Sequence, residues 1–573
     1  MPIRFFVALL ALACFCISSA AFAQTSFKLP KTVKVDPAAL NDEPICDPKI
    51  SASWRKAQEI EGVKIQESHI CSPDNPALIA AAVKGTNNIS MATLMETDLS
   101  ADTIIKTDDL DGDGDPDRII IKLEVMELNG PSPDFEGLIP TFDIAPGIQP
   151  GAWVFAPKTR GMSTENFESV RANPLMRLPS PVIRVEQGDI VQIVLENTHY
   201  LPHTIHLHGV DHPYSHSDEH VEGGDGVPQT SEMFLMPGEQ RTYEFSARQT
   251  GTMLYHCHVQ THTHLAMGLV GMIIVEENRP NNWLQTLNVG AGHVRHPSVA
   301  IQEEFDREYD LHYHAMDKEL TEIIQKYNDP RLVARDMNRL YDITDSTEDY
   351  YMLNGLSFPY TLRESIITAE PDEKIKLRVA NTASEMLSLH THGHKATITH
   401  YDGIEHNPIA QIQRDVYALS AAQRIDLTLN TTNDGLNSYG EGIWLFHDHR
   451  EKGITNNGMS PGGNVSLIAY KSYLNDLGLP KGQGIDISKY FTQEFHQRKL
   501  PIWQDLDDVG TLGAAGGQTG LDPATRTALF NFLYGLLAGL VLYLLIAKRQ
   551  QAKQAIAQAF AKLKGSKGSK END

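Results

Sequence analysis

The chain contains the stretch His256-Cys257-His258-Val259-Gln260-Thr261-His262, and Met267 follows five residues later. A cysteine thiolate, histidine imidazoles and a weak methionine thioether are the ligands of a blue-copper electron-transfer site. In an extended strand, neighbouring side chains point to opposite faces. We therefore expect Cys257 to face one way, and the flanking His256 and His258 to face the other. Such a strand would contact two metal sites and join them through a few covalent bonds.

The composition limits the classes of function. A chain of 573 residues is long enough for about two to four domains. Hydrophobic residues make up 41%, which is enough for real cores, and the net charge of −24 argues against nucleic acid as a partner.

Both ends of the chain carry targeting signals. Residues 1–23 resemble a secretory signal peptide, with Arg4, an apolar run and the small-residue cleavage site Ala21-Phe22-Ala23; a first membrane anchor is the alternative. Residues 528–547 carry no charge and can span a bilayer once, and a buried core helix is the alternative there. The basic tail, residues 548–573, should stay cytoplasmic. We expect an exported protein in a bacterial-type inner membrane, with its ectodomain on the periplasmic side.

The cysteines divide into three groups. Cys14 and Cys16 leave with the signal peptide. Cys46 and Cys71 lie near the mature N-terminus of an exported chain, so we expect a disulfide between them rather than a separate metal site. Cys257 is left over, and a free thiol in an oxidising compartment needs a reason, which copper supplies.

An acidic loop precedes the first strand-rich region. Its carboxylates alternate and Gly114 stands sixth, as at the start of a calcium loop. The twelfth position is Ile120 rather than glutamate, so a calcium-stiffened loop and a solvated acidic turn both remain open hypotheses. The calcium ligands would be Asp109, Asp111, Asp113, Asp115 and Asp117.

Two strand-rich regions, residues 118–280 and 298–490, make up most of the chain. Runs such as Ile190 to Leu195 have the composition of strands, and turn signals separate them. This spacing predicts all-β sandwich or barrel domains. Residues 24–117 form an N-terminal extension, about 318–340 a helical insertion, and 500–527 a flexible stalk.

The two regions repeat one another. Each has a His-x-His after a strand that ends in asparagine, and a second His-x-His about 50 residues later. Residues two apart on a strand share a face, so each pair offers two converging imidazoles. Four such pairs in a twofold repeat indicate a metal centre. They are His206/His208 and His256/His258 in the first region, and His390/His392 and His447/His449 in the second.

These motifs resemble those of the multicopper oxidases. The matching stretches are Pro202-His203-Thr204-Ile205-His206-Leu207-His208-Gly209, Asp225-Gly226-Val227-Pro228-Gln229, Met236-Pro237-Gly238, Tyr255-His256-Cys257-His258, Leu389-His390-Thr391-His392-Gly393 and Phe446-His447-Asp448-His449. The resemblance covers roughly residues 118 to 490. It implies an all-β chain with two cupredoxin-like Greek-key β-sandwich domains.

The resemblance also implies four copper ions per chain and their ligands. His203, Cys257, His262 and Met267 would bind the type 1 copper, and His206 and His390 the type 2 copper. The type 3 pair would be bound by His208, His256, His258, His392, His447 and His449. Asp225 stands where the family has an acid that donates protons to reduced oxygen.

Two positions depart from the family pattern. Asp448 stands where a second type 1 cysteine could have stood, so the resemblance implies one blue copper, in domain 1. Small two-domain laccases place it in domain 2. Gln260 stands where some metal-oxidising relatives carry an acid, which weakens a specific iron-oxidase interpretation.

The implied activity is one-electron oxidation of a phenolic or metal-ion donor, coupled to four-electron reduction of dioxygen to water. Two-domain relatives close the cluster between neighbouring chains, so we expect a homotrimer. One alternative is a copper nitrite reductase, which needs only three histidines at its catalytic copper. Others are a protein that oxidises or stores metal ions, and a copper-binding or copper-tolerance protein without turnover. The loop with His212, His216, Asp218, Glu219 and His220 is either a substrate-metal site or a solvated acidic loop.

Overall fold

The structure is a computed structural model, which describes most of the chain. The described residues are 55–68, 75–134, 136–166, 168–215, 223–228, 230–296, 298, 304–475, 478–481, 487–499 and 523–565. The predicted signal peptide, Cys46, Cys71 and most of the predicted stalk lie outside them.

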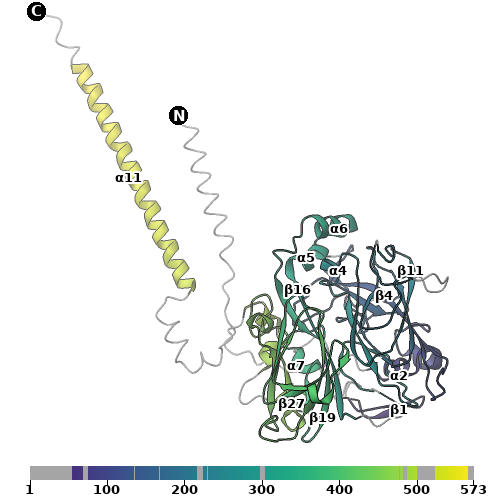
Figure 1. Ribbon diagram of the computed structural model, residues 1–573. Coiled ribbons are helices and arrows are strands. Elements are labelled where there is room, and N and C mark those ends of the chain that lie inside the picture. Colours follow the sequence, from purple (N-terminus) through teal and green to yellow (C-terminus); the bar gives the residue numbers. More distant parts are fainter. Residues whose placement is uncertain are drawn as a thin grey trace, which may run out of the picture. The chain divides into compact units, whose positions relative to one another are not determined.

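Domain 1 is a sandwich of two sheets (Figure 1). One contains, in order, β10 (His206–His208), β12 (Gly251–His256), β13 (Val270–Glu276), β8 (Val182–Glu186) and β14 (Leu287–Asn288). The other contains β11 (Gln240–Ser246), β9 (Ile190–Glu196), β4 (Arg118–Leu128) and β3 (Ile104–Thr107), with β7 (Ala152–Pro157) also on β4. A short hairpin of β5 (Gly130–Pro131) and β6 (Leu138–Ile139) follows β4, and α4 (Thr261–His264) precedes β13.

Domain 2 repeats this design. Its larger sheet contains β15 (Gly292–His293), β16 (Arg307–Asp317), β19 (Lys374–Asn381), β25 (Arg424–Asn430), β21 (Ala396–Tyr401) and β22 (Ile404–Glu405), with β17 (Glu348–Leu353) on β16 and β23 (Ile412–Arg414) on β21. The other contains β18 (Ile367–Ala369), β27 (Ser466–Tyr470), β26 (Ile443–Asp448), β20 (Leu387–Thr391) and β24 (Val416–Leu419). Short helical segments are α7 (Thr361–Glu364), α8 (Gln493–His496), η3 (Pro408–Ala410), η4 (Glu451–Ile454), η5 (Lys471–Tyr473) and η6 (Ile487–Phe491).

Hydrogen bonds show which positions of the two domains correspond. The side-chain amides of Asn197 and Asn381 each donate to a carbonyl four residues later and to another 38 residues later. The hydroxyls of the next residues, Thr198 and Thr382, each donate to a carbonyl of a long neighbouring strand. That strand is β4, parallel to β9, in domain 1 and β16, parallel to β19, in domain 2. These shared bonds align the domains residue by residue around the asparagine.

The described part of the N-terminal extension belongs to the core of domain 1. It contains β1 (Gln58–Ile60), β2 (Val63–Ile65), α2 (Pro76–Lys84), η2 (Thr86–Asn88) and α3 (Met91–Met95). Asn75 caps α2 by accepting from the N–H groups of Ala77 and Leu78. Apolar residues occupy nearly every position of α2, and seven of them are buried in the main core cluster or beside it.

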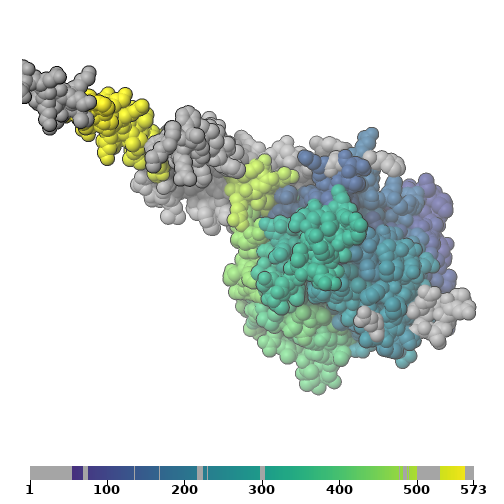
Figure 2. All heavy atoms as spheres, turned by 90° about the horizontal axis from the view of Figure 1, so that it is seen from above, coloured from purple at the N-terminus to yellow at the C-terminus, as the bar shows by residue number. Residues whose placement is uncertain are grey.

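The predicted helical insertion is a pair of helices, α5 (Lys318–Lys326) and α6 (Pro330–Arg339). Proline fits the first turn of a helix but not its interior, so Pro330 starts a new helix. Leu320, Ile324 and Met337 pack into the core cluster of domain 1 although the segment follows a strand of domain 2. Figure 2 shows this teal segment between the blue spheres of domain 1 and the green spheres of domain 2.

A buried ion network joins the domains. Arg184 on β8 donates to Asp310 Oδ1 at 2.7 Å and to Glu308 Oε1 at 3.2 Å, both on β16. Arg378 on β19 donates to Glu276 Oε2 on β13 at 2.7 Å. Removing one partner of a buried ion pair is strongly destabilising. The network therefore fixes how the two domains pack.

The C-terminal helix α11 (Pro523–Gly565) is long and apolar enough, over Phe530–Ala561, to span a membrane. Its apolar side chains, including Leu536 and Leu540, are exposed. The charge-free run predicted from the sequence, residues 528–547, lies within this helix.

Candidate metal centres

Cys257 follows β12 directly, and its thiol is completely buried. Its Sγ atom lies 3.6 Å from Nδ1 of His203 and 3.4 Å from Nδ1 of His264. A sulfur at about 2.3 Å and nitrogens at about 2.0 Å from one metal ion lie roughly this far apart. Met267 is fully buried in the same core cluster. The donor set therefore fits a soft metal ion such as copper.

The second imidazole beside the thiol belongs to His264, whereas the motif spacing assigned it to His262. Gln260 adopts the left-handed conformation and starts α4. Residues two apart on a helix point about 200° away from one another, so His264 is buried against Cys257 while His262 is exposed to solvent. The spacing alone could not reveal this, because a short helix replaces the extended chain that the motif suggests.

Burial sets the protonation of this group. It raises the pKa of the Cys257 thiol to about 12, lowers the pKa of His264 to about 3, and holds the pKa of His203 well below its usual value. Neutral imidazole is the metal-binding form. A bound metal ion would displace the thiol proton.

The first histidine quartet lies on β10 and at the end of β12. His206, His208 and His256 bring ligand nitrogens within 4.8 Å of one another. Nε2 of His208 is 2.9 Å from Nε2 of His256, and the His258 ring lies 5.2 Å from the His206 ring. Burial lowers the pKa of His208 to about 3 and that of His256 to about 4. These neutral rings suit metal binding.

The second quartet lies on β20 and around the end of β26, at corresponding positions of domain 2. The rings of His390 and His392 are 4.6 Å apart, and Nε2 of His392 is 3.2 Å from Nε2 of His447. The His449 ring lies 5.5 Å from the His390 ring and is exposed. All four predicted histidines of this domain thus lie together.

Backbone carbonyls orient two rings in each quartet. The Nδ1–H groups of His206 and His390 donate to the carbonyls of Asp225 and Asp415 at 2.7 and 2.8 Å. A carbonyl only accepts, so the proton is on Nδ1 and the Nε2 lone pair is free for a metal ion. His256 and His447 make the same bond to the carbonyl of the next residue, at 2.9 and 2.8 Å. Asp415 was not among the predicted site residues, although it follows His390 by 25 residues as Asp225 follows His206 by 19.

Asp225 lies beside the first quartet. Its Oδ1 atom is 3.3 Å from Nδ1 of His206 and 3.7 Å from Nε2 of His212. At Gly226, where φ is +76°, a Cβ atom would lie 1.9 Å from the Ile205 carbonyl oxygen. Glycine is therefore required for the acid to approach the histidine strand. The remaining members of the His212 loop, from position 216 to position 220, lie outside the described residues.

The two quartets do not meet within one chain. Among the described residues, which include all eight histidines, no ring contact or hydrogen bond joins one quartet to the other. Each is therefore half of a larger centre or a separate site.

Asp448 occupies the position in domain 2 that corresponds to Cys257. Its Oδ2 atom accepts from Nε and Nη2 of Arg450 at 2.9 and 2.8 Å, and its Oδ1 atom accepts from the N–H of Ser388 at 3.1 Å. A Cβ atom on Gly453 would lie 2.5 Å from the same carboxylate. A buried ion pair thus fills the place where domain 1 has its thiol.

The acidic loop brings together only some of its predicted ligands. Oxygen atoms of Asp109, Asp111 and Asp117 lie within 4.8 Å of one another. Asp109 already accepts from the N–H groups of three later residues, and Asp115 accepts from the N–H of Asn282 at 2.6 Å. Asp113 and Asp115 are not members of this group. A calcium site here stays a prediction.

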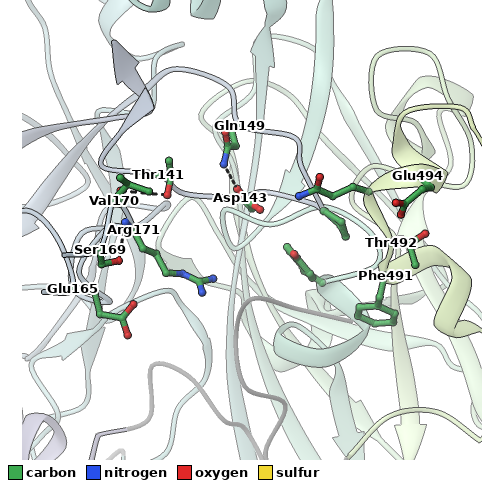
Figure 3. Close-up of a pocket in the computed structure, with 13 residues that line it drawn as sticks. Thr141, Asp143, Gln149, Glu165, Ser169, Val170, Arg171, Phe491, Thr492 and Glu494 are labelled. Carbon is green, nitrogen blue, oxygen red and sulfur yellow. Dashed lines mark hydrogen bonds between the residues drawn. The ribbon is translucent and has the colours of Figure 1, made fainter. Parts of the chain in front are cut away.

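A polar cavity of about 560 Å³ lies away from the histidines (Figure 3). Residues of the loops from Thr141 to Arg171 line one side, and residues of α8 with Phe491 and Thr492 line the other. Inside it, Gln149 donates to Asp143 at 2.6 Å. None of the predicted metal ligands lines this cavity.

Two family models match separate parts of the chain. A family model described as multicopper oxidase matches residues 175–280, and a second with the same description matches residues 333–461. Laccase-3 of Botryotinia fuckeliana is 32% identical over 114 residues, which are 19% of this chain and 23% of the relative. Copper resistance protein A of Escherichia coli is 24% identical over 293 residues, 46% of this chain and 44% of the relative. These matches span less than half of either relative.

Among solved structures, a blue copper oxidase from Nitrosomonas europaea is 24% identical and superposes with a TM-score of 0.44, covering 66% of this chain and 94% of that one. The two family matches, together with the two-sheet sandwiches, confirm the expectation of two cupredoxin-like domains.

Proposed function

Because two multicopper oxidase family models match the chain, we propose that it is a multicopper oxidase, which couples one-electron oxidation of a small donor to four-electron reduction of dioxygen to water. One observation carries this proposal: the thiol of Cys257 faces two imidazoles, while the residues on either side of it, His256 and His258, belong to a histidine quartet. A donor site and an oxygen site would thus be joined by adjacent residues of one chain.

The ligand assignment follows the geometry. His203, Cys257 and His264 would hold the type 1 copper, with Met267 as a fourth, weak ligand, and His206 and His390 would hold the type 2 copper. Copper bound at these positions would take up electrons singly beside Cys257 and pass four of them to dioxygen. The type 3 ligands would be His208, His256, His258, His392, His447 and His449.

The oxygen site would form between chains. Each quartet is partly open to solvent, so the first quartet of one copy can face the second quartet of another. Exposed apolar residues adjoin the second quartet: Val416 pairs with His390, and the carbonyl of Leu445 accepts from the His392 N–H. Ile409, which is 97% exposed, and Leu436 are further exposed apolar residues of domain 2. Large exposed apolar patches mark protein interfaces, and a closed ring of three copies is the expected assembly.

The assembly is tested by a charge placed on this face. Val416→Asp should give a monomer that keeps the blue colour of the type 1 site but loses oxygen uptake, as measured by sedimentation, absorption and an oxygen electrode. An exposed position away from the face, Glu168→Lys, serves as the control. A wild-type monomer with full copper and oxygen turnover would contradict the assembly.

Asp225 is proposed to hold a proton at its carboxylate, next to His206, for transfer to reduced oxygen. Its 3.3 Å approach to the His206 ring and its partial exposure support this role. Asp225→Asn should slow oxygen reduction by about 100-fold, within the usual range for a general acid. Donor oxidation by the blue site should continue until that site is reduced.

The donor is tested directly with the copper-loaded protein. Oxygen uptake is measured with a phenol, with ferrous iron and with cuprous copper, the last because one relative is named a copper resistance protein. Nitrite in place of oxygen distinguishes a nitrite reductase. Copper and colour without any turnover would indicate a copper-binding scaffold and would overturn the proposal.

The location is proposed from the helix α11, which can span a membrane once. Its basic tail would lie on the cytoplasmic side. The two domains would then face the periplasm, where oxygen and metal ions are accessible.

A further inference from the structure

A third imidazole, that of His199, lies behind the site formed by Cys257, His203 and His264, which we call the thiolate site. Nδ1 of His203 faces Cys257, and its other nitrogen, Nε2, is 2.9 Å from Nδ1 of His199. Nε2 of His199 in turn lies 3.7 Å from Oε2 of Glu127. A continuous line of polar atoms therefore runs from the thiolate site to Glu127.

The protons along this line have one consistent direction. A metal ion on Nδ1 of His203 leaves the proton on Nε2, which then donates to Nδ1 of His199. His199 must then carry its own proton on Nε2, which faces the Glu127 carboxylate. The bond from His203 thus fixes the tautomer of His199, whose Nε2 proton lies 3.7 Å from the Glu127 carboxylate, beyond hydrogen-bond distance.

Glu127 is held by further donors. Its Oε2 atom accepts from Nε1 of Trp153 at 3.0 Å and from the hydroxyl of Tyr200 at 2.5 Å. A Cβ atom on Gly130 would lie 2.2 Å from Glu127 Oε1, so a glycine at this point of the hairpin leaves room for the carboxylate. The Trp153 ring also contacts the His199 ring, with centroids 4.9 Å apart.

Neither imidazole of the thiolate site is open to a donor molecule. His203 is 0% exposed and His264 is 1% exposed. The Trp153 ring makes edge contacts with both rings, and the insertion with α5 and α6 packs into the same core. The Glu127 side chain, in contrast, is 19% exposed. Of the groups in this line, the carboxylate is therefore accessible while the imidazoles next to the thiol are not.

Domain 2 shows which residues the fold has at these positions when the cysteine is replaced by Asp448. The asparagine alignment places Ala383 at the position of His199, and Leu387 at the position of His203. The strand pairings place Ala315 and Tyr351 at the positions of Glu127 and Trp153. Ala315, Tyr351 and Ala383 form a small apolar cluster. The sandwich therefore does not need the polar line for its stability, and only the domain with the thiol carries it.

We propose that His199 positions His203, and that Glu127 is the surface point at which the reducing donor binds and its electron enters. This rests on the proposed oxidase function. Each donor loses one electron, which the type 1 site gains, and no proton is transferred. Because Glu127 presents negative charge, a cationic donor such as a metal ion is favoured over an anionic one.

The donor step is tested in the full copper-loaded protein without oxygen. Reduction of the blue site is followed by its absorption, with hexaammineruthenium(II) as cationic donor and ferrocyanide as anionic donor. Glu127→Ala, which introduces the residue of domain 2, and Glu127→Gln, which keeps the shape, should each slow reduction by the cation by about 10-fold or more. Reduction by the anion should be unchanged or faster. Asp134→Ala removes an exposed carboxylate from the next loop and should change neither rate.

The positioning role is tested by spectroscopy rather than turnover. His199→Ala should shift the electron paramagnetic resonance and absorption of the blue site, because His203 loses the acceptor of its Nε2 proton. His199→Gln, which keeps an acceptor, should restore most of the signal. Unchanged spectra in His199→Ala, or equal slowing of both donors in Glu127→Gln, would overturn the proposal.

Failure of the oxidase function gives a different result. A wild-type protein without a blue site, or without oxygen uptake, would refute the proposed function. A blue, active wild type whose Glu127 variants are reduced at the normal rate would refute only the entry route.

Discussion

The two domains share a framework and differ where a metal ion would sit. Both have the asparagine that ties the strand end to two carbonyls, and both have a histidine quartet on matching strands. At the buried position that follows the third histidine of each quartet, domain 1 has Cys257, which contacts His203, and domain 2 has Asp448. Leu387 of domain 2 stands at the position of His203. The same sandwich therefore accommodates either a thiol or an ion pair at this position. A few side chains determine which of the two is present.

The largest effect is expected from breaking the second quartet. Replacing His390 and His392 together by alanine should reduce oxygen uptake to background, because the proposed oxygen site takes ligands from both domains. The blue site lies wholly in domain 1 and should keep its colour. Absorption and an oxygen electrode measure both. Loss of the blue colour together with oxygen uptake would contradict the claim that the blue site forms in domain 1 independently of the histidines of domain 2.

The ion pair of domain 2 should matter for stability alone. Asp448→Ala leaves Arg450 without its main partner in a mostly buried place, and should lower the free energy of unfolding by about 3 kcal/mol. Colour should be unaffected. Unfolding in urea is compared with Glu451→Ala, which removes an exposed carboxylate nearby. Equal unfolding midpoints of the two variants would argue against a structural role for the pair.

The copper-free protein should lose stability as pH falls below about 6.5, the usual histidine value. Burial lowers the pKa of His203 well below this value and that of His264 to about 3. Below about pH 6.5 the unfolded chain therefore binds protons at these histidines while the native chain does not. His203→Leu, which copies domain 2, should show a smaller loss. Burial raises the pKa values of Glu186 and Asp189 to about 8 and 7, so these two groups stabilise the native protein as the pH falls. They are present in the wild type and in the variant, so their effect cancels when the two proteins are compared. Thermal unfolding of both proteins at pH 7.5 and pH 5 measures this loss of stability. An equal fall in the unfolding temperature of the two proteins would contradict the explanation.

The smallest effect is expected at Met267. Met267→Leu removes the proposed weak thioether ligand and should raise the reduction potential of the blue site, because a weak thioether tunes that potential. Copper content and turnover should persist. A redox titration followed by absorption checks this, and an unchanged or lower potential would remove Met267 from the ligand set.

Much of this arrangement could be predicted because it depends on local spacing. A His-x-His on a strand places two rings on one face wherever the strand lies, and each set of four predicted histidines lies together. The exchange of His262 for His264 could not be predicted, because it depends on a left-handed Gln260 that starts one turn of helix. The line from His203 to Glu127 joins residues far apart in sequence, and only the pairing of β4 with β7 and β9 brings them together. Packing of α5 and α6 on domain 1 likewise depends on tertiary contacts.

In the proposed route, every electron reaches the histidine quartets through the site formed by Cys257, His203 and His264. The most direct test of this route is the copper content, colour and oxygen uptake of Cys257→Ser beside the wild type. We expect the variant to bind one copper ion fewer per chain, to lose the blue colour, and to stop consuming oxygen while it stays folded. Oxygen consumption at the wild-type rate in the colourless variant would contradict the account.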